Sequence, residues 1–385
     1  MDLLLDDQEI EIKEAAAEFL AGECSPTLVR KVEGDATFYS LDLWRKFAEN
    51  GWLQLCLSED VGGQGLPLSY LALLFELAGK NIAPIPLHAT MVPALVIDQY
   101  GSAEQRERLK DVMAGQLILS HAVVDRLGRW TTERVGVEGK VEGDQLVLNG
   151  VKGFVDAFPV SQQCAVIYRD ADNGELGVAL VPTDAQGVSQ DTLAPMAKDA
   201  EAIVHFDNVR VPASARIGQP GDQGAAAIRM MDLASVLYAS QMAGAAGHTL
   251  AMAVEHAKER VAFGQPIGAF QAIQHMCANM LNAVDGTTML AREALWRMDQ
   301  KLPHRMNIAQ AKSFANEQCM MVCRSAQQIH GGMGFMLEFD LNLWYRRVGS
   351  WSLRGGTSAE HRRTIASVLL DKVGQVRIGT VPNAI

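Results

Sequence analysis

The chain has 385 residues, of which 48% are hydrophobic and 21% are charged. This size and composition predict an ordinary soluble globular protein that folds as two or three closely packed regions. The formal net charge of -11 opposes nonspecific attraction to nucleic acid or to anionic lipid. No segment reaches the roughly 20 apolar residues of a membrane span, and the first residues lack the basic stretch of a secretion signal, so we expect a cytoplasmic protein with no membrane or nucleic-acid partner.

The six cysteines are scattered, without a Cys-x-x-Cys pair. This spacing argues against a disulfide framework and against a zinc ribbon, and we predict no metal site. Cys319 and Cys323 lie one helical turn apart in an apolar run. We expect them to pack as small hydrophobic residues in a helix core.

The first region, residues 1–116, has the pattern of a helical domain. Apolar residues recur at helical spacing from Ile10 to Phe19, and further helices are expected over Leu43–Gly51 and Tyr70–Ala78. Between them, residues 58–65 are rich in glycine. We predict a turn there, whose glycines supply positive φ.

The second region, residues 117–220, changes to a period of two and is predicted to be a β domain. Runs of β-forming residues occur at Gln145–Gly150, Cys164–Tyr168 and Ile203–Phe206, with turn-forming residues between them. A strand over Phe206–Pro212 is expected to end this domain.

The third region, residues 221–385, returns to helices, and these are long. They are expected over residues 225–260, 268–301, 305–330 and 359–373. Helices of this length indicate a bundle whose outer faces are buried between subunits.

Four residues around the junction of the first two long helices form a candidate binding segment for a phosphate-containing cofactor. Arg260 ends a helix, Phe263 and Gly264 permit a tight turn, and Gln271 offers an amide where the next helix starts. A guanidinium can chelate pyrophosphate oxygens in a fork. The alternative role for Arg260 is to satisfy the terminal carbonyls of its helix.

A second candidate segment follows the third long helix. Gln328 and His330 precede Gly331 and Gly332. This glycine run follows a helix, whereas a dinucleotide fingerprint must follow a strand, so we reject a Rossmann or Walker interpretation. The glycines are expected to cap the helix, and their bare backbone would also let a ligand approach. His330 is interpreted as structural rather than as a titrating base.

These motifs, together with Gly355-Gly356-Thr357, resemble those of the acyl-CoA dehydrogenases. The resemblance implies a mainly α fold with a central β-barrel or sandwich domain between an N-terminal helical domain and a C-terminal helical bundle. It also implies FAD as the cofactor. In that family these motifs contact the pyrophosphate and adenosine of an FAD held mainly by a neighbouring subunit. The corresponding residues are Arg260, Phe263, Gln271, Gln328, Gly331 and Gly332.

The residues that complete the site in this family are replaced. Gly355 occupies the usual position of the glutamate that removes the substrate's α-proton, so no catalytic residue is assigned. Relatives with the glutamate elsewhere carry it at the position of Ala234 and follow it with an arginine, here Ser235. Asp232 is considered as a substitute base.

The flavin-face motifs are also replaced. By register, Val124 and Asp156 occupy positions where the family places hydroxyl groups that contact the flavin ring. A carboxylate near reduced flavin would oppose its negative charge.

A basic cluster of Arg354, His361, Arg362 and Arg363 follows the Gly355 segment in sequence. It could receive a phosphate of CoA or FAD, or form a solvated helix start or a salt bridge between subunits. The ending of this segment also resembles the base-lacking subunits of heteromeric acyl-CoA dehydrogenases, a type found in bacterial steroid side-chain catabolism.

A heteromer would explain why the motifs that contact a neighbouring subunit's FAD are kept while the catalytic glutamate and the flavin-face motifs are replaced. The leading hypothesis is therefore an acyl-CoA dehydrogenase subunit in an α₂β₂ complex, with a catalytic partner subunit, an acyl-CoA substrate and an electron acceptor flavoprotein. One alternative is a self-sufficient homomeric flavoenzyme with a relocated base such as Asp232 or Asp156. Another is a structural or regulatory paralogue without turnover.

Overall fold

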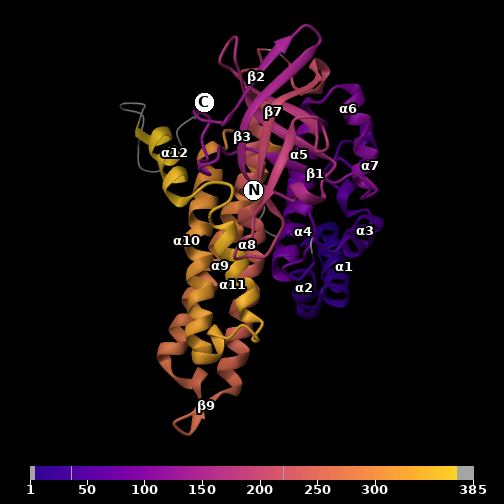
Figure 1. Cartoon of the computed structure of the whole chain (residues 1–385). Helices are drawn as coiled ribbons and strands as arrows, with labels where there is room; N and C mark the ends of the chain where they lie inside the picture. Colours follow the sequence, from indigo (N-terminus) through magenta and orange to yellow (C-terminus); the bar gives the residue numbers. More distant parts are fainter. Residues whose placement is uncertain (1–4, 36, 220, 371–385) are drawn as a thin grey trace. The chain divides into compact units, whose positions relative to one another are not determined.

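The computed structural model describes residues 5–35, 37–219 and 221–370 (Figure 1). By their contacts, the residues group into two compact units. Unit 1 comprises Met1–Val29, Pro67–Ala83 and Ser235–Ile385, and unit 2 comprises Arg30–Leu66 and Pro84–Ala234. The domain boundaries at residues 116 and 220 stay a prediction.

Unit 1 is helical. Its helices are α1 (Asp7–Glu23), α4 (Leu68–Lys80), most of α8 (Ala225–Glu259), α9 (Gln271–Asp299), α10 (Arg305–His330), α11 (Leu341–Trp351) and α12 (Ser358–Leu370), with the short turns η5 (Ile267–Ala269) and η6 (Gly331–Phe335). A small hairpin of β9 (Val261–Ala262) and β10 (Gln265–Pro266) joins α8 to η5. Helix α2 (Pro26–Val32) begins in this unit.

The long helices expected in the third region are confirmed, and the last predicted residues, 371–373, lie outside the described part. Helix α11 was not predicted. Its signal was present, because Leu341, Trp344 and Val348 recur at helical spacing and are buried. Gly331 ends α10 with a φ of 63°, so the predicted glycine cap is confirmed.

Glycine lets two helices of unit 1 touch closely. A Cβ at Gly79 on α4 would lie 1.9 Å from the carbonyl oxygen of Gln241 on α8, and one at Gly244 on α8 would lie 1.7 Å from that of Glu76. No side chain fits at such a distance, so both positions require glycine. Glu76 also pairs with Arg292 on α9 at 3.1 Å, which links three helices of the bundle.

Unit 2 combines short helices with a sheet. The helices are α3 (Leu41–Glu49), α5 (Leu87–Tyr100), α6 (Ala103–Glu107) and α7 (Leu109–Met113), with short turns η1 (Trp52–Gln54), η2 (Glu59–Val61), η3 (Phe158–Val160) and η4 (Ala213–Ala215). The strands are β1 (Leu119–Ala122), β2 (Val137–Glu142), β3 (Gln145–Asp156), β4 (Gln163–Asp170), β5 (Leu176–Pro182), β6 (Val188–Thr192), β7 (Glu201–Pro212) and β8 (Arg216–Ile217). Together with unit 1 this gives the predicted mainly α fold with a central β region.

The strands form one eight-stranded sheet in the order β6-β7-β3-β2-β4-β5-β8, with β1 beside β4. The pairs β1·β4 and β2·β4 are parallel and the others are antiparallel. Leu146, Leu148, Val166 and Val204 belong to its apolar core. The three predicted β runs and the strand ending at Pro212 are confirmed.

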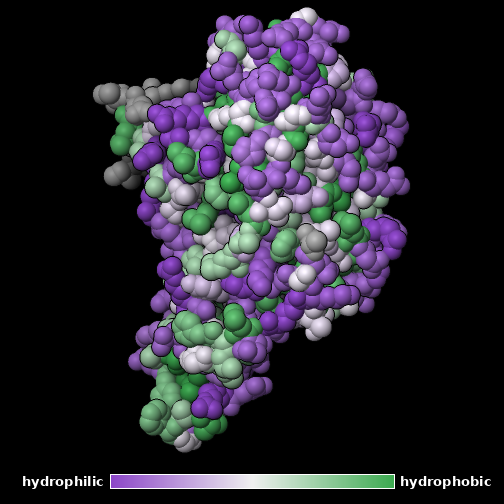
Figure 2. Space-filling view, in the orientation of Figure 1, coloured by the Kyte–Doolittle hydropathy of each residue, from purple (hydrophilic) through white to green (hydrophobic). Residues whose placement is uncertain are grey.

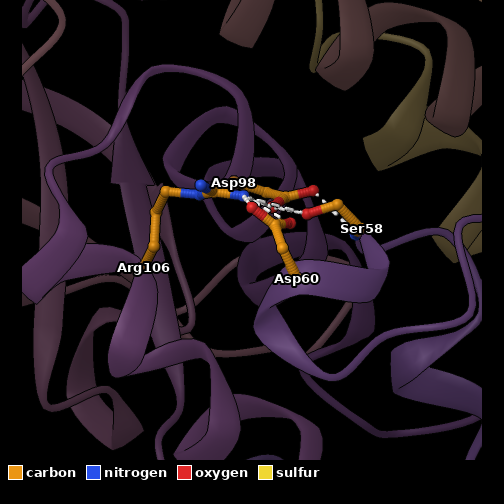
Figure 3. Close-up of polar contacts among 4 residues, drawn as sticks. All are labelled: Ser58, Asp60, Asp98 and Arg106. Atoms are coloured by element: carbon orange, nitrogen blue, oxygen red, sulfur yellow. Dashed lines mark hydrogen bonds and ion pairs between the residues drawn. The ribbon is translucent and has the colours of Figure 1, made fainter.

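The glycine-rich turn at residues 58–65 is held by an ion-pair network (Figure 3). The backbone amide of Ser58 donates to Asp98 at 2.9 Å, and the Ser58 hydroxyl donates to the same carboxylate. Arg106 donates to the Ser58 hydroxyl at 3.1 Å and to Asp60 at 2.7 Å. The hydrogen bonds of Asp60 to Ser58 and Arg106 lower the pKa of this carboxyl. Gly62 in the turn has a φ of 95°, as predicted.

None of the helices in the described ranges is long and apolar enough to cross a membrane. Those ranges also contain no group of three or more His, Cys, Asp or Glu side chains that could hold a metal ion. Cys319 and Cys323 are buried in the core of α10, as predicted, and burial raises the pKa of each thiol to about 12.

Candidate functional site

The β9–β10 hairpin presents a strained and exposed aromatic residue. Gln265 pairs with Ala262, so Phe263 and Gly264 form a two-residue loop. Their φ values are 52° and 82°, as such loops require. This conformation suits glycine and is unfavourable for phenylalanine, yet the Phe263 side chain is also 95% exposed. An exposed ring on strained backbone suggests a role in binding.

Arg260 lies between α8 and this hairpin. Its backbone amide donates to the carbonyl of His256 at 2.9 Å, and its carbonyl accepts from the amide of Ile267 at 2.8 Å. The side chain is exposed, and within the described residues its guanidinium makes no hydrogen bond or ion pair. Arg260 therefore closes the helix end through its backbone, which leaves the guanidinium available for an anion.

Two amides and two glycines predicted to bind the cofactor are also exposed in unit 1. Gln271 starts α9 and Gln328 lies in the last turn of α10. At Gly331 and Gly332 a Cβ would meet nothing within 4 Å. The bare backbone after α10 therefore faces open space, where a flat or extended ligand can approach it closely.

A pair of histidines brings the two candidate segments together. His256, one turn before Arg260, stacks on His330, the residue before Gly331, with ring centroids 4.4 Å apart and an interplanar angle of 24°. The end of α8 therefore lies against the end of α10. The sequence had assigned His330 a structural role and had not identified His256.

Exposed apolar side chains gather at this end of unit 1. Figure 2 shows hydrophobic surface gathered there, at the end where Figure 1 places β9. The exposed large hydrophobic residues of the two segments are Val261, Phe263, Met333, Phe335, Met336 and Leu337. Contiguous exposed apolar surface of this kind is typical of a protein or ligand interface.

The turn that contains Gly355 is buried and its backbone is fixed by hydrogen bonds. The carbonyl of Gly355 accepts from the hydroxyl of Ser235 at 2.9 Å and contacts Nε2 of His361 at 2.8 Å. The carbonyl of Gly356 accepts from the side-chain amide of Asn316 at 3.0 Å. The two glycines have φ values of 65° and 96°, where a side chain would add strain.

Lys312 extends this network into the core. Its ammonium group is fully buried and donates to the carbonyl of Trp351 at 3.0 Å and to the side-chain oxygen of Asn316. Burial lowers the pKa of Lys312 to about 7. Burial and the nearby charge of Lys312 lower the pKa of His361 to about 4. Ser235, Asn316, Lys312 and His361 therefore position the turn, and none of them is a carboxylate that could replace the missing glutamate.

The two carboxylates considered as substitute bases differ in burial. Asp156 is 8% exposed and accepts a hydrogen bond from the hydroxyl of Tyr39 at 2.8 Å. Asp232 is partly exposed on α8. Burial is the main reason why the pKa of Tyr100 is raised, and the charges of Asp222 and Asp232 add to it.

The segment around Val124 forms a turn closed by its own side chains. Asp125 accepts hydrogen bonds from the amide of Leu127 at 2.9 Å and from the guanidinium of Arg129 at 2.6 Å. The carbonyl of Val124 accepts from the amide of Gly153 at 3.3 Å. None of these groups is a hydroxyl that could donate to a flavin ring.

The basic cluster predicted near the Gly355 segment is divided. The buried His361 contacts the Gly355 carbonyl, whereas the exposed Arg362 pairs with Glu317 on α10 at 2.7 Å. Arg363 is exposed on α12, and Arg354, which precedes this helix in the chain, is partly buried. Arg362 therefore has an ion pair within its own chain.

Comparison with known proteins agrees with this architecture. The family descriptions "Acyl-CoA dehydrogenase, N-terminal domain" and "Acyl-CoA dehydrogenase, C-terminal domain" match residues 6–116 and 222–370. The caffeyl-CoA reductase-Etf complex subunit CarC of Acetobacterium woodii is 28% identical over 96% of this chain and 100% of its own length.

Two solved structures are also similar. A variant of the Tcur3481-Tcur3483 steroid acyl-CoA dehydrogenase has a TM-score of 0.86 and 27% identity, covering 94% of this chain and 97% of that chain. The ChsE4-ChsE5 complex of Mycobacterium tuberculosis has a TM-score of 0.90 and 22% identity, covering 97% and 100%, and it supports the fold alone. The chain therefore belongs to the acyl-CoA dehydrogenase family, whose cofactor is FAD.

Proposed function

We propose that this chain is a subunit of a heteromeric acyl-CoA dehydrogenase that catalyses α,β-dehydrogenation of an acyl-CoA thioester. In an α₂β₂ complex it supplies the cross-subunit half of the FAD site, and a related partner subunit supplies the flavin-ring contacts and the catalytic base. The observation that carries this proposal is the exposed guanidinium of Arg260, which has no hydrogen bond or ion pair within the described residues.

The residues of this end of unit 1 fit the pyrophosphate and adenosine of FAD. A free guanidinium can bind two phosphate oxygens in a fork. The exposed amides of Gln271 and Gln328 can bind polar groups of the nucleotide, and the open backbone at Gly331 and Gly332 admits it. The exposed Phe263 supplies apolar contact to the cofactor or to the neighbouring subunit.

The residues at the other predicted contacts do not fit the flavin ring. Val124 has no hydroxyl, and Asp156 is a buried carboxylate that accepts from Tyr39 rather than donating. A negative charge there would oppose the charge of reduced flavin. This contrast between the two halves supports a division of the site between two different chains.

In the assembled enzyme, bound FAD would accept the hydride that leaves the β-carbon of the substrate. The residues of this chain bind and orient the cofactor, and the α-proton goes to a carboxylate of the partner subunit. At Gly355, the backbone carbonyl is held by Ser235 and His361, so this turn contributes a fixed main chain and no proton acceptor.

The relatives suggest the other participants. The name of the Acetobacterium woodii protein places it in a complex with Etf, which supports an electron acceptor flavoprotein for this chain. The likeness to the Tcur3481-Tcur3483 steroid enzyme supports a steroid-CoA as the substrate to test first. A homomeric enzyme with Asp232 as the base is the main alternative, since this carboxylate is partly exposed on α8.

The chain expressed alone should contain little FAD, whereas co-expression with its partner should give a yellow complex. The ratio of flavin absorbance to protein measures this. One FAD per chain in a homodimer would contradict the heteromer.

In the complex, Arg260→Ala should lose charge-assisted hydrogen bonds of about 1.5 to 3 kcal/mol, and so weaken FAD binding by roughly ten- to a hundredfold. Arg260→Lys should restore only part, because an ammonium group cannot bind in a fork. Arg45→Ala is the matched control, since Arg45 is an exposed residue of α3 paired with Asp42. An unchanged dissociation constant in Arg260→Ala would remove Arg260 from the site.

A further inference from the structure

The stacked rings of His256 and His330 lie beside the proposed pyrophosphate site. His256 is partly buried in the last turn of α8, and His330 is buried in the last turn of α10. Phe339, in the loop between η6 and α11, packs on His330 with ring centroids 5.1 Å apart. Nδ1 of His330 lies 2.8 Å from the carbonyl oxygen of Ala326, which can only accept, so this nitrogen carries a hydrogen.

Among the described residues, three groups shift the pKa of His256 through their charge. They are Glu259 at the end of α8, Arg260 directly after it, and His330 at the end of α10. Burial is the first cause that lowers the pKa of His256, the charges of His330 and Arg260 lower it further, and Glu259 opposes them. In the free chain the pKa of His256 therefore lies below that of an unperturbed histidine.

A bound pyrophosphate would reverse this balance. Arg260 and His256 are separated by one helical turn, so an anion chelated by the guanidinium brings negative charge close to the imidazole. Negative charge at short range favours the protonated form of histidine. The C-terminal end of α8, where both residues lie, favours a cation as well.

We propose that His256 is a further cofactor-binding residue, which takes up one proton from solvent when the pyrophosphate of FAD binds at Arg260. This inference rests on the proposed function, because it requires the cofactor at Arg260. No covalent bond forms or breaks. His330 positions the ring of His256 by stacking, and its own Nδ1 stays bonded to the Ala326 carbonyl.

The first test measures the dissociation constant of FAD in the holoenzyme between about pH 6 and about pH 8, the range in which histidine titrates. Linked uptake of one proton should weaken FAD binding as the pH rises, by at most about tenfold per pH unit. Calorimetry in buffers of different ionisation enthalpy should record protons taken up on binding.

The variant His256→Tyr keeps an aromatic ring to stack on His330 but cannot become a cation. It should flatten the pH dependence of FAD binding and abolish the proton uptake. His205→Gln is the matched control, because His205 is an exposed residue of β7 bonded to Asp191, outside unit 1. This control should keep the pH dependence of the unchanged protein.

Two failures can be told apart. If Arg260→Ala leaves FAD binding unchanged, the proposed cofactor site fails and this inference falls with it. If Arg260→Ala weakens FAD binding but His256→Tyr retains the full pH dependence and proton uptake, the cofactor site stands. His256 then has only a packing role, and the present inference is wrong.

Discussion

The strained hairpin permits a prediction in which stability and binding change in opposite directions. Phe263 has a φ of 52° and is 95% exposed, so its ring contributes little burial to the folded chain while its backbone pays for the left-handed conformation. That conformation costs a residue other than glycine about 1 to 2 kcal/mol. Glycine loses about 0.5 to 1 kcal/mol in extra conformational entropy. Phe263→Gly should therefore stabilise the isolated chain by about 0.5 to 1 kcal/mol, measured by urea unfolding.

The same change should weaken the assembled enzyme. If Phe263 becomes fully buried against the cofactor or the neighbouring subunit, its loss removes about 1.5 to 3 kcal/mol of apolar stabilisation. This corresponds to roughly ten- to a hundredfold weaker binding, which titration of the complex with FAD and with partner subunit would measure.

Lys301 provides the matched control for Phe263. It follows α9 with a φ of 53° and is exposed, and its backbone amide donates to Met298 at 3.1 Å. Lys301→Gly should give a similar gain in stability with no change in FAD or partner binding. A loss of stability in Phe263→Gly beside a gain in Lys301→Gly would show that contacts such as the one with Phe270 hold the hairpin. Unchanged assembly of Phe263→Gly would refute its role in binding.

Two further predictions concern the Gly355 turn. Gly355→Glu should produce no dehydrogenation of acyl-CoA by the isolated chain, as measured by flavin bleaching, and robust turnover would show that the site here is complete. The same change should destabilise the chain by at least about 1 kcal/mol in urea unfolding, because the position is buried with a φ of 65°. The pKa of His361 is lowered from 6.5 to about 4 in the folded chain. As the pH falls from about 6.5 to about 4, this histidine is protonated in the unfolded chain but not in the folded one, so the chain should lose stability. The loss should reach about 3 kcal/mol and shrink in His361→Gln, and an equal pH dependence in that variant would refute the assignment.

Local patterns in the amino-acid sequence predicted the order of the long helices and of the β runs. Apolar residues recur about every 3.6 residues in a helix and every second residue in a strand when one face is buried. These periods can be read from the sequence alone. Gly331 marked the end of a helix, because glycine adopts the positive φ that often follows a last helical turn. The lack of a side chain at Gly355 is equally a property of the sequence alone.

Which side chains take part in hydrogen bonds and ring contacts depends on how distant segments pack together. The sequence left two roles open for Arg260, and the backbone bonds of Arg260 leave its guanidinium available. It left Asp156 as a possible base, and the hydroxyl of Tyr39, 117 positions away in the chain, engages that carboxylate. It gave no reason to link His256 with His330, because their stacking depends on how α8 and α10 pack. Hydrogen bonds and ring contacts between distant residues follow from the arrangement of elements, and no local pattern encodes them.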